Sequence, residues 1–401
     1  MELTLTEIKP ILKHIIDNNF KQQDEFGRIP LGVDIKGHCG IGKSEVVEQL
    51  AKEYDANFVK LNLAMMCETG DLCGFPIREH YVCKPDEDCQ WITSELIDSY
   101  SKAGYTITPE TRMSYALPTW FKDIDTSKPT FFVLDDYNRA IPALLQATME
   151  LVYKQEYLSW KLPAKTQVIL TSNYDDGSYS VNSLDAAQSS RYVSFNVKFD
   201  PIAWAQWAQT EGIDNRCQNF LLLYHHELMN RKQGYSKVNA RNYTMFSNII
   251  AGIPDWTTVD NQALILQIAS GCFLDDDDIV GGLFTQFISN KLDRLIDPEE
   301  LVLGKWESVK RKLQDQLYDD DNYRADIANV ITTRFINFSS NWIEKGNDIM
   351  VIVNRILEII DNDKMLLSED LLFSLVKTLN INYPSKCSKL ILNPKIARKL
   401  M

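Results

Sequence analysis

Residues 37–44 read GHCGIGKS, a glycine-rich segment that ends in lysine and serine. The segment fits the pattern G-x-x-x-x-G-K-S, and it lies between a predicted strand in RIPLGVDIKG and a predicted helix in SEVVEQLAKEY. Glycines let the backbone wrap closely enough for its N–H groups to face phosphate oxygens, and a helix N-terminus adds a dipole that favours negative charge. The stretch therefore predicts a strand–loop–helix unit that binds a nucleotide.

The loop also contains side chains suited to phosphate and metal. We expect Lys43 to reach the β- and γ-phosphates and the Ser44 hydroxyl to bind Mg²⁺. The predicted nucleotide-binding residues are Gly37, His38, Cys39, Gly40, Ile41, Gly42, Lys43 and Ser44. The alternative is a glycine-rich turn that happens to contain Lys-Ser, which the flanking strand and helix disfavour. ATP and Mg²⁺ are the predicted ligands.

Residues 131–140 read FFVLDDYNRA, an apolar run followed by two adjacent carboxylates. Adjacent carboxylates repel each other and are costly to desolvate, so their position at the end of a buried strand needs a reason. A nucleotide loop needs a partner strand that ends in acid. Asp135 would hold Mg²⁺ through its water shell, and Asp136 would polarise the attacking water. The alternative is a charged turn after a buried strand.

Strands alternate with helices in the first half of the chain. The predicted strands lie in RIPLGVDIKG (28–37), NFVKLNL (57–63), TFFVLDD (130–136), TQVILTSN (166–173) and RYVSFNV (191–197). This alternation predicts an α/β fold with a five-stranded parallel sheet covered by helices on both faces. From Asp200 onwards helical periods dominate, and KFDPI (198–202) is a candidate domain boundary.

Charge and hydropathy restrict the function classes. The 401 residues include 42 Lys and Arg against 55 Asp and Glu, a formal net charge of −13 that argues against broad DNA binding. No run reaches the roughly 20 apolar residues that a membrane span needs. The start MELTLTEIKPILK shows no secretory signal, so we expect a cytoplasmic chain whose eight cysteines are reduced.

The order of the motifs resembles a known family. GHCGIGKS, LDDYNRA, ILTSN and the SSR before the fifth strand occur in the order and strand context of AAA+ ATPases. More narrowly they resemble the MoxR and dynein-related (midasin-type) branch, whose second acidic motif typically reads D-E-I-N-R-A. The stretches GDLCGFP, YALPTW and RLIDPEELV look like those of MoxR-like ATPases frequent in bacteriophages.

The resemblance covers about 30–305 and implies a P-loop AAA+ sheet followed by an all-α lid. The expected division is a helical segment over 1–24, a nucleotide-binding α/β domain over 25–199 with an insertion at about 64–120, a helical lid over 200–305 and a helical C-terminal extension over 306–401. The extension carries no motif of the family.

The resemblance also implies roles for later residues. Asn173 would be the sensor that orients the attacking water, and Arg191 falls where the family places an arginine finger that acts on a neighbouring subunit's nucleotide. Arg241 sits where the lid supplies a second sensor arginine, and Arg139 is a candidate for the subunit interface. Each arginine has the alternative of a surface charge or a salt-bridge partner.

One residue departs from the family pattern. The family usually has Glu where this chain has Asp136, whose carboxylate is one methylene shorter. A misplacement of about 1 Å can cost on the order of a hundredfold in rate. Asp can still accept and orient water, so we expect slow hydrolysis rather than none.

The insertion combines cysteines with aromatic residues. Zinc is one alternative for Cys67, Cys73, His80, Cys83 and Cys89, but spacings of C-x5-C are wider than zinc knuckles use, so free thiols are expected. The candidate contacts to a client protein are Tyr81, Trp91, Tyr105 and Trp120, with burial in a core as their alternative.

The resemblance implies an ATP-hydrolysing ring, by analogy a hexamer, that acts as a chaperone and remodels or assembles a protein partner. Phage origin would place it in the host cytoplasm. Two alternatives remain open: a nucleotide-binding assembly or structural component with vestigial hydrolysis, and a DNA-handling AAA+ motor or loader.

Overall fold

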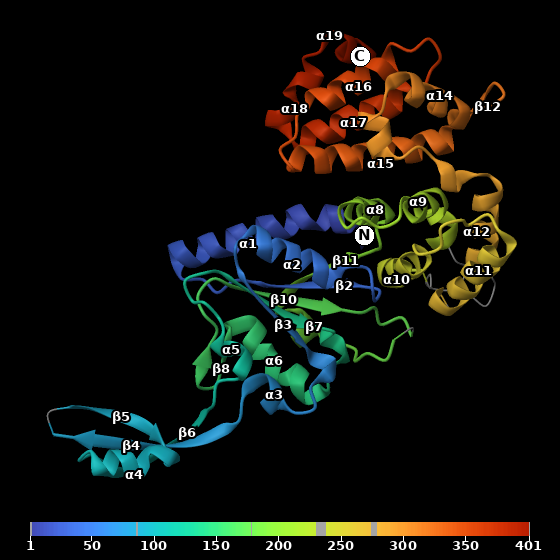
Figure 1. The fold of residues 1–401 in the computed structure, drawn as a ribbon. Helices are drawn as coiled ribbons and strands as arrows, with labels where there is room; N and C mark the ends of the chain where they lie inside the picture. The colour runs from blue at the N-terminus through green and yellow to red at the C-terminus, as the bar shows by residue number, and fades with distance from the viewer. Residues whose placement is uncertain (1, 86, 178, 230–237, 274–278, 401) are drawn as a thin grey trace. The chain divides into compact units, whose positions relative to one another are not determined.

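The computed structural model describes residues 2–85, 87–177, 179–229, 238–273 and 279–400 (Figure 1). The chain forms two compact units, Met1–Phe199 and Asp200–Met401, each of which is described here by itself. The first unit contains the phosphate-loop sequence and both adjacent carboxylates. The second unit contains the segments predicted as lid and extension, and their separation stays a prediction.

The first unit alternates strands and helices. Its strands are β1 (Glu2–Leu3), β2 (Gly32–Gly37), β3 (Asn57–Asn62), β4 (Pro76–Lys84), β5 (Glu87–Thr93), β6 (Thr106–Tyr115), β7 (Thr130–Asp135), β8 (Glu156–Tyr157), β9 (Trp160–Lys161), β10 (Thr166–Ser172) and β11 (Tyr192–Val197). Its helices are α1 (Leu5–Phe26), α2 (Lys43–Glu53), α3 (Thr69–Cys73), α4 (Ile97–Lys102), α5 (Thr119–Lys122), α6 (Pro142–Lys154) and α7 (Ala186–Ser189), with 3₁₀ turns η1 (Leu63–Met65), η2 (Ser94–Leu96) and η3 (Tyr137–Arg139).

The central sheet is parallel and confirms the predicted α/β class. Its strand order is β1-β11-β2-β10-β7-β3, so it has six strands rather than the five predicted. The additional strand pairs Glu2 with Asn196 and Leu3 with Val197 at one edge. A two-residue segment carries no hydrophobic periodicity, which is why the sequence pattern did not predict it.

Helices cover both faces of the sheet (Figure 1). Successive β7 side chains point to opposite faces, so Phe131 and Val133 pack with α1 and α2, whereas Phe132 and Leu134 pack with α6. All four of these residues are fully buried, as expected for a strand covered on both faces. The apolar run of β7 therefore anchors the end of the strand at which the carboxylates lie.

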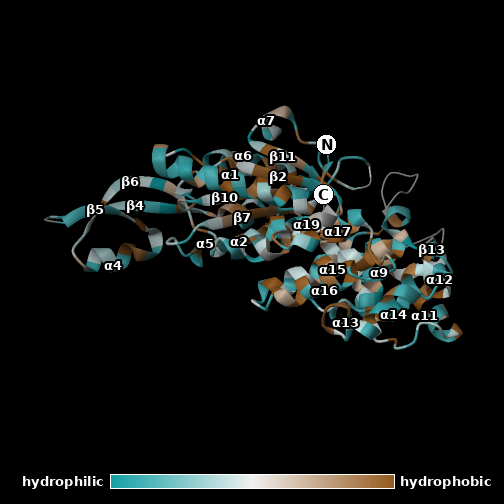
Figure 2. Ribbon diagram, turned by 90° about the horizontal axis from the view of Figure 1, so that it is seen from above, coloured by the Kyte–Doolittle hydropathy of each residue, from teal (hydrophilic) through white to brown (hydrophobic). Residues whose placement is uncertain are grey.

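The insertion forms a second sheet, which the sequence pattern did not predict. Strands β4, β5 and β6 pair antiparallel in the order β5-β4-β6. In Figure 2 β4 and β5 are coloured mainly as hydrophilic, whereas β2 and β7 are mainly hydrophobic. We name this three-stranded sheet over residues 76–115 the arm.

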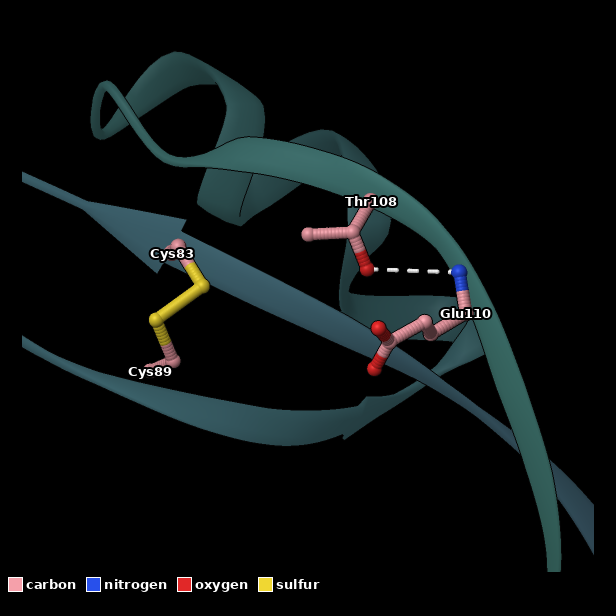
Figure 3. The surroundings of a disulfide bond; sticks show 4 residues. All are labelled: Cys83, Cys89, Thr108 and Glu110. Atoms are coloured by element: carbon pink, nitrogen blue, oxygen red, sulfur yellow. Dashed lines mark hydrogen bonds between the residues drawn. A yellow bond between two sulfur atoms is a disulfide. The ribbon is translucent and has the colours of Figure 1, made fainter.

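A disulfide joins Cys83 of β4 to Cys89 of β5, and their Cα atoms lie 4.2 Å apart (Figure 3). The expectation that all eight cysteines are reduced is therefore wrong for this pair, because the hairpin places the two side chains side by side. On the adjacent strand β6, the Glu110 N–H donates to the Thr108 hydroxyl at 3.3 Å. The disulfide also removes both cysteines from the zinc alternative, and no group of three or more metal-binding side chains occurs among the residues that the structure describes.

Trp120 is partly buried and packs against the core of the first unit, which favours the core alternative over a client contact for this residue. Its ring centroid lies 4.9 Å from that of Phe132 and 5.9 Å from that of Trp160. Tyr81 and Trp91 instead lie on the arm, with ring centroids 4.8 Å apart.

The second unit is mainly helical. Its helices are α8 (Pro201–Thr210), α9 (Asn215–Met229), α10 (Ala240–Ile250), α11 (Val259–Phe273), α12 (Ile279–Ser289), α13 (Pro298–Leu303), α14 (Trp306–Leu317), α15 (Ala325–Glu344), α16 (Met350–Ile360), α17 (Glu369–Asn382), α18 (Pro384–Ile391) and α19 (Pro394–Leu400), with a 3₁₀ turn η4 (Leu292–Arg294). A two-stranded ribbon joins β12 (Tyr318–Asp319) to β13 (Asn322–Tyr323). Across the described ranges, no helix combines the length and apolar content that a membrane crossing needs.

Candidate functional site

The loop after β2 adopts a conformation that requires glycine at two positions. A Cβ at Gly37 would lie 2.4 Å from the Val197 carbonyl oxygen, so no side chain fits there. Gly42 has φ of 97°, in the left-handed region that glycine occupies at little cost, and it forms the N-cap of α2. The chain therefore turns directly from the buried strand β2 into a helix whose N-terminus faces the loop, as the sequence predicts.

Lys43 lies at the centre of this loop and is 8% exposed. Its Nζ donates to the carbonyl oxygens of Gly37 at 2.7 Å and His38 at 2.8 Å, and to Asn173 Oδ1 at 3.3 Å. Burial lowers the pKa of Lys43 to about 8, although the nearby carboxylates, Asp136 first among them, oppose this shift. The ammonium is thus a positive charge that is poorly solvated and aimed along the loop.

Asp135 lies at the end of β7 and is held by three donors. Its Oδ1 accepts from the Ser44 hydroxyl at 2.6 Å and from the Thr171 hydroxyl, and its Oδ2 lies 2.9 Å from Lys60 Nζ. Burial raises the pKa of Asp135, but the three donors together outweigh burial and hold the pKa below its usual value. The Ser44 hydroxyl of the phosphate loop and the first acid are therefore in direct contact, and their joint binding of a metal ion stays a prediction.

Asp136 points to different partners from its neighbour. Its backbone is left-handed, with φ of 52° and ψ of 40°, which turns its side chain away from that of Asp135. Its Oδ1 accepts from Asn173 Nδ2 at 2.9 Å, and its Oδ2 lies 3.9 Å from the exposed Arg139 guanidinium. The two carboxylates are thus separated by backbone geometry and partnered individually.

Asn173 is fixed in place by Asn138, a residue that the sequence analysis did not single out. Asn138 Nδ2 donates to the Asn173 carbonyl at 2.8 Å, and the Asn173 N–H donates to Asn138 Oδ1 at 3.0 Å. Both residues are fully buried. The only available signal was the position of Asn138 two residues after the acids, because the pairing depends on how η3 packs beside the end of β10.

Thr171 was likewise not predicted, although it lies two residues before Asn173 in ILTSN. Its hydroxyl donates to Asp135 and accepts from the Asp136 N–H at 3.2 Å, so one hydroxyl orders both acidic residues. Alternation along β10 places Thr171 and Asn173 on the same side of the strand.

His38 and Cys39 contact a tyrosine from a distant part of the unit. Tyr179 lies with its hydroxyl 3.2 Å from His38 Nδ1, and that hydroxyl accepts from the Cys39 N–H at 3.3 Å. The His38 ring also packs edge-on against Tyr174, with centroids 4.8 Å apart. Burial lowers the pKa of His38. These contacts place aromatic side chains next to the phosphate loop.

Asp34 is a buried carboxylate of β2 that the sequence analysis missed. It accepts from the Ser172 hydroxyl at 2.7 Å and from the Ser194 hydroxyl at 2.8 Å, on the strands to either side. Burial raises the pKa of Asp34. This cross-strand arrangement braces the sheet just before the loop begins.

Within the first unit, Arg191 does not lie at this site. Arg191 precedes β11, which pairs in parallel with β2 so that Tyr192 lies opposite Gly32 and Val197 opposite Gly37. Arg191 therefore lies at the amino-terminal ends of the strands, on the order of 15–20 Å from the phosphate loop of the same chain. Its guanidinium donates to the Ala187 carbonyl. Arg241 is exposed on α10 in the second unit, and its role as a second sensor arginine stays a prediction.

The arrangement combines a glycine loop, a buried ammonium and two acids at the carboxyl edge of a parallel sheet, where open α/β sheets bind ligands. Backbone N–H groups and Lys43 suit phosphate oxygens. A hydroxyl and a carboxylate that already touch suit a hard divalent cation such as Mg²⁺. The residues present thus fit a phosphate ester together with a metal.

Comparisons with known proteins give limited likenesses. No family model and no curated protein matches the chain. Among solved structures, RuvB from Thermotoga maritima, a Holliday junction branch migration motor, has 10% identity and a TM-score of 0.36 over 76% of this chain and 81% of that chain. A RuvB variant from the same organism has 10% identity and a TM-score of 0.38 over 78% and 84% of the two chains. A putative ATPase from Cytophaga hutchinsonii has 13% identity and a TM-score of 0.30 over 85% and 82%. Likenesses at this level carry no inference about activity.

Proposed function

We propose that this chain is an AAA+ ATPase of the MoxR-like type, which binds ATP with Mg²⁺ and hydrolyses it. The observation that carries the proposal is the convergence of Lys43, Ser44, Asp135, Asp136 and Asn173 at one edge of the sheet, with the contacts given above. Five polar side chains from three separate strand ends meet there in the order that the family resemblance implies, and all but Asp136, which stands where the family usually has Glu, are of the implied type.

Each residue has a defined task in the proposed reaction. Lys43 and the loop N–H groups bind the phosphates, and Ser44 with Asp135 would hold Mg²⁺, which supplies charge neutralisation at the phosphates. The Asp136 carboxylate accepts a hydrogen bond from the attacking water and orients that water in line with the γ-phosphate. Asn173 in turn orients the Asp136 carboxylate through its 2.9 Å hydrogen bond. Catalysis then depends on positioning and on charge, with no covalent intermediate.

Assembly into a ring is part of the same proposal. A developing negative charge at the γ-phosphate needs a further cation, and Arg191 is at the opposite edge of its own sheet. We propose that Arg191 acts on the site of a neighbouring subunit, that Arg241 acts as the second sensor, and that the ring, a hexamer by analogy, remodels a protein client. Bacteriophage origin remains a proposal from the resemblance.

A second candidate function is a nucleotide-stabilised assembly component that does not turn over. The observation that favours it is Asp136, which is shorter than the usual Glu and is already engaged by Asn173 and Arg139.

The test is Mg²⁺-dependent phosphate release measured across a range of protein concentrations. We expect the rate per chain to rise with concentration and to fall at least a hundredfold in Asp136→Asn, which keeps the shape and the hydrogen bond but cannot act as a base. Tight ATP binding without turnover in the native chain would support the second candidate and contradict the first.

A further inference from the structure

Lys60 of β3 is a charged side chain that approaches the proposed metal site. Its Nζ lies 2.9 Å from Asp135 Oδ2, while the Ser44 and Thr171 hydroxyls occupy Oδ1. No motif of the family includes this position, and nothing in the proposed reaction above uses it.

The contact follows from the register of the sheet. In the parallel pair β3·β7, Lys60 lies opposite Val133 and Asn62 lies opposite Asp135, so the lysine is two residues before the end of the edge strand. A lysine side chain is long enough to reach diagonally to the carboxylate at the end of the neighbouring strand. Its side chain remains 40% exposed, whereas that of Asp135 is 15% exposed.

Such a pair contributes little to the stability of the fold. Solvent screens the charges of an ion pair that contains a solvated lysine, and the lysine side chain loses entropy when it is held in one geometry. The larger effect of Lys60 is on whatever else binds at Asp135. A fixed ammonium beside a carboxylate cancels part of the negative potential that attracts a divalent cation.

We propose that Lys60 is a positioning residue that acts through Asp135 and sets the Mg²⁺ affinity of the nucleotide site, keeping it weaker than the hydroxyl–carboxylate pair alone would make it. The inference rests on the proposed function, since it concerns the same metal. The site would accordingly bind metal chiefly together with the phosphates, whose negative charge offsets the ammonium.

The experiment uses the full chain and a fluorescently labelled ATP, with binding measured first in EDTA and then during titration with Mg²⁺. The variants are Lys60→Met, which removes the charge but keeps the length, and Lys60→Arg, which keeps the charge. The matched control is Lys128→Met. Lys128 forms an exposed ion pair with Asp55 at 2.8 Å, and this pair lies at the opposite end of the strand pair β3·β7.

We expect Lys60→Met to lower the Mg²⁺ concentration at half-saturation on the order of fivefold, as one unit charge acting on a dication through solvent would do. Lys60→Arg and Lys128→Met should match the native chain, and affinity in EDTA should be the same for all. An unchanged or higher half-saturation in Lys60→Met overturns the inference, and so does an equal shift in Lys128→Met.

Weaker binding of Lys60→Met in EDTA also overturns it, because Lys60 would then contact phosphate directly. These outcomes are distinct from a failure of the proposed function. If the native chain, shown to be folded by circular dichroism, does not bind labelled ATP with Mg²⁺, the proposed function and this inference fall together. If the native chain binds and the Lys60 variants titrate like it, only the inference falls.

Discussion

Raising the pH should weaken nucleotide binding because the Lys43 ammonium loses its proton. The ammonium is buried between two carbonyl oxygens and Asn173, and burial lowers its pKa to about 8, well below the ordinary value of 10.5. Only the protonated form attracts phosphate. Below pH 8 that form predominates, and it is lost as the pH rises through 8.

The magnitude follows from the titration curve. With a pKa of about 8, roughly nine tenths of the chains carry the charge at pH 7 and roughly one tenth at pH 9. Because only the charged fraction binds well, the dissociation constant should rise about tenfold between pH 7 and pH 9, with a slope that approaches tenfold per pH unit above that.

The assay is titration of labelled ATP at saturating Mg²⁺ from pH 6.5 to 9.5 and constant ionic strength, with circular dichroism to show that the fold persists. The matched control is Lys43→Arg, whose guanidinium stays protonated throughout this range. A flat profile for the native chain up to pH 9.5 would refute the reasoning. The same decline in Lys43→Arg would assign the effect to another group.

Three further results are expected. Arg191→Ala should bind ATP normally and release no phosphate, whereas Lys43→Ala should not bind ATP. If Arg191 acts on the nucleotide of a neighbouring subunit, mixing the two variants should restore phosphate release. Phosphate release at the native rate by Arg191→Ala alone would contradict its role as an arginine finger. Asn138→Ala should lower the free energy of unfolding by about 2–4 kcal/mol, since it removes two buried hydrogen bonds and strands the backbone groups of Asn173; urea titration measures this, and a loss under 1 kcal/mol would count against the pairing. Burial raises the pKa of Asp34 above its unfolded value of 3.8, so in the pH range between the two values the native chain binds more protons than the unfolded chain, and the free energy of unfolding falls as the pH rises. Thermal denaturation of Asp34→Asn should show a flatter dependence on pH in this range. A pH profile identical to that of the native chain would remove Asp34 as the cause.

The sheet strands that carry the site could be predicted because their sequences are nearly continuous apolar runs. FFVL in β7 and QVIL in β10 have no alternative to burial on both faces, and the polar residues that follow each run come at the strand end. The parallel pairing then brings Asp135 and Asn173 to one edge without any long-range information. The glycine loop was equally readable from its G-x-x-x-x-G-K-S pattern, and the structure gives the reason for its first glycine, because a Cβ at Gly37 would lie 2.4 Å from the Val197 carbonyl oxygen.

The arm could not be predicted because most of its side chains are exposed and only a few, such as Val82 and Ile92, are buried. β6 reads TITPETRMSY, which contains a proline and is almost entirely exposed, so no period of two is visible. Its pairing depends on backbone hydrogen bonds to β4, and the Cys83–Cys89 disulfide depends on the separate pairing of β4 with β5. Lys60, Thr171 and Asn138 were missed for a related reason: each acts through a contact across strands, whereas sequence motifs record only neighbours along the chain.

The left-handed backbone of Asp136 also explains the residue found there. Among residues with a side chain, Asp and Asn adopt this conformation most readily, whereas longer side chains such as Glu adopt it at a cost of about 1–2 kcal/mol. A carboxylate at this turn is therefore accommodated at a lower backbone cost as the short acid, although longer side chains such as Gln155 and Lys165 do adopt positive φ elsewhere in the chain. Introducing Glu would lengthen the reach toward water while opposing the φ of 52° that separates the side chain from Asp135. Substitution at this one position thus changes the reach of the catalytic carboxylate and the stability of the turn together.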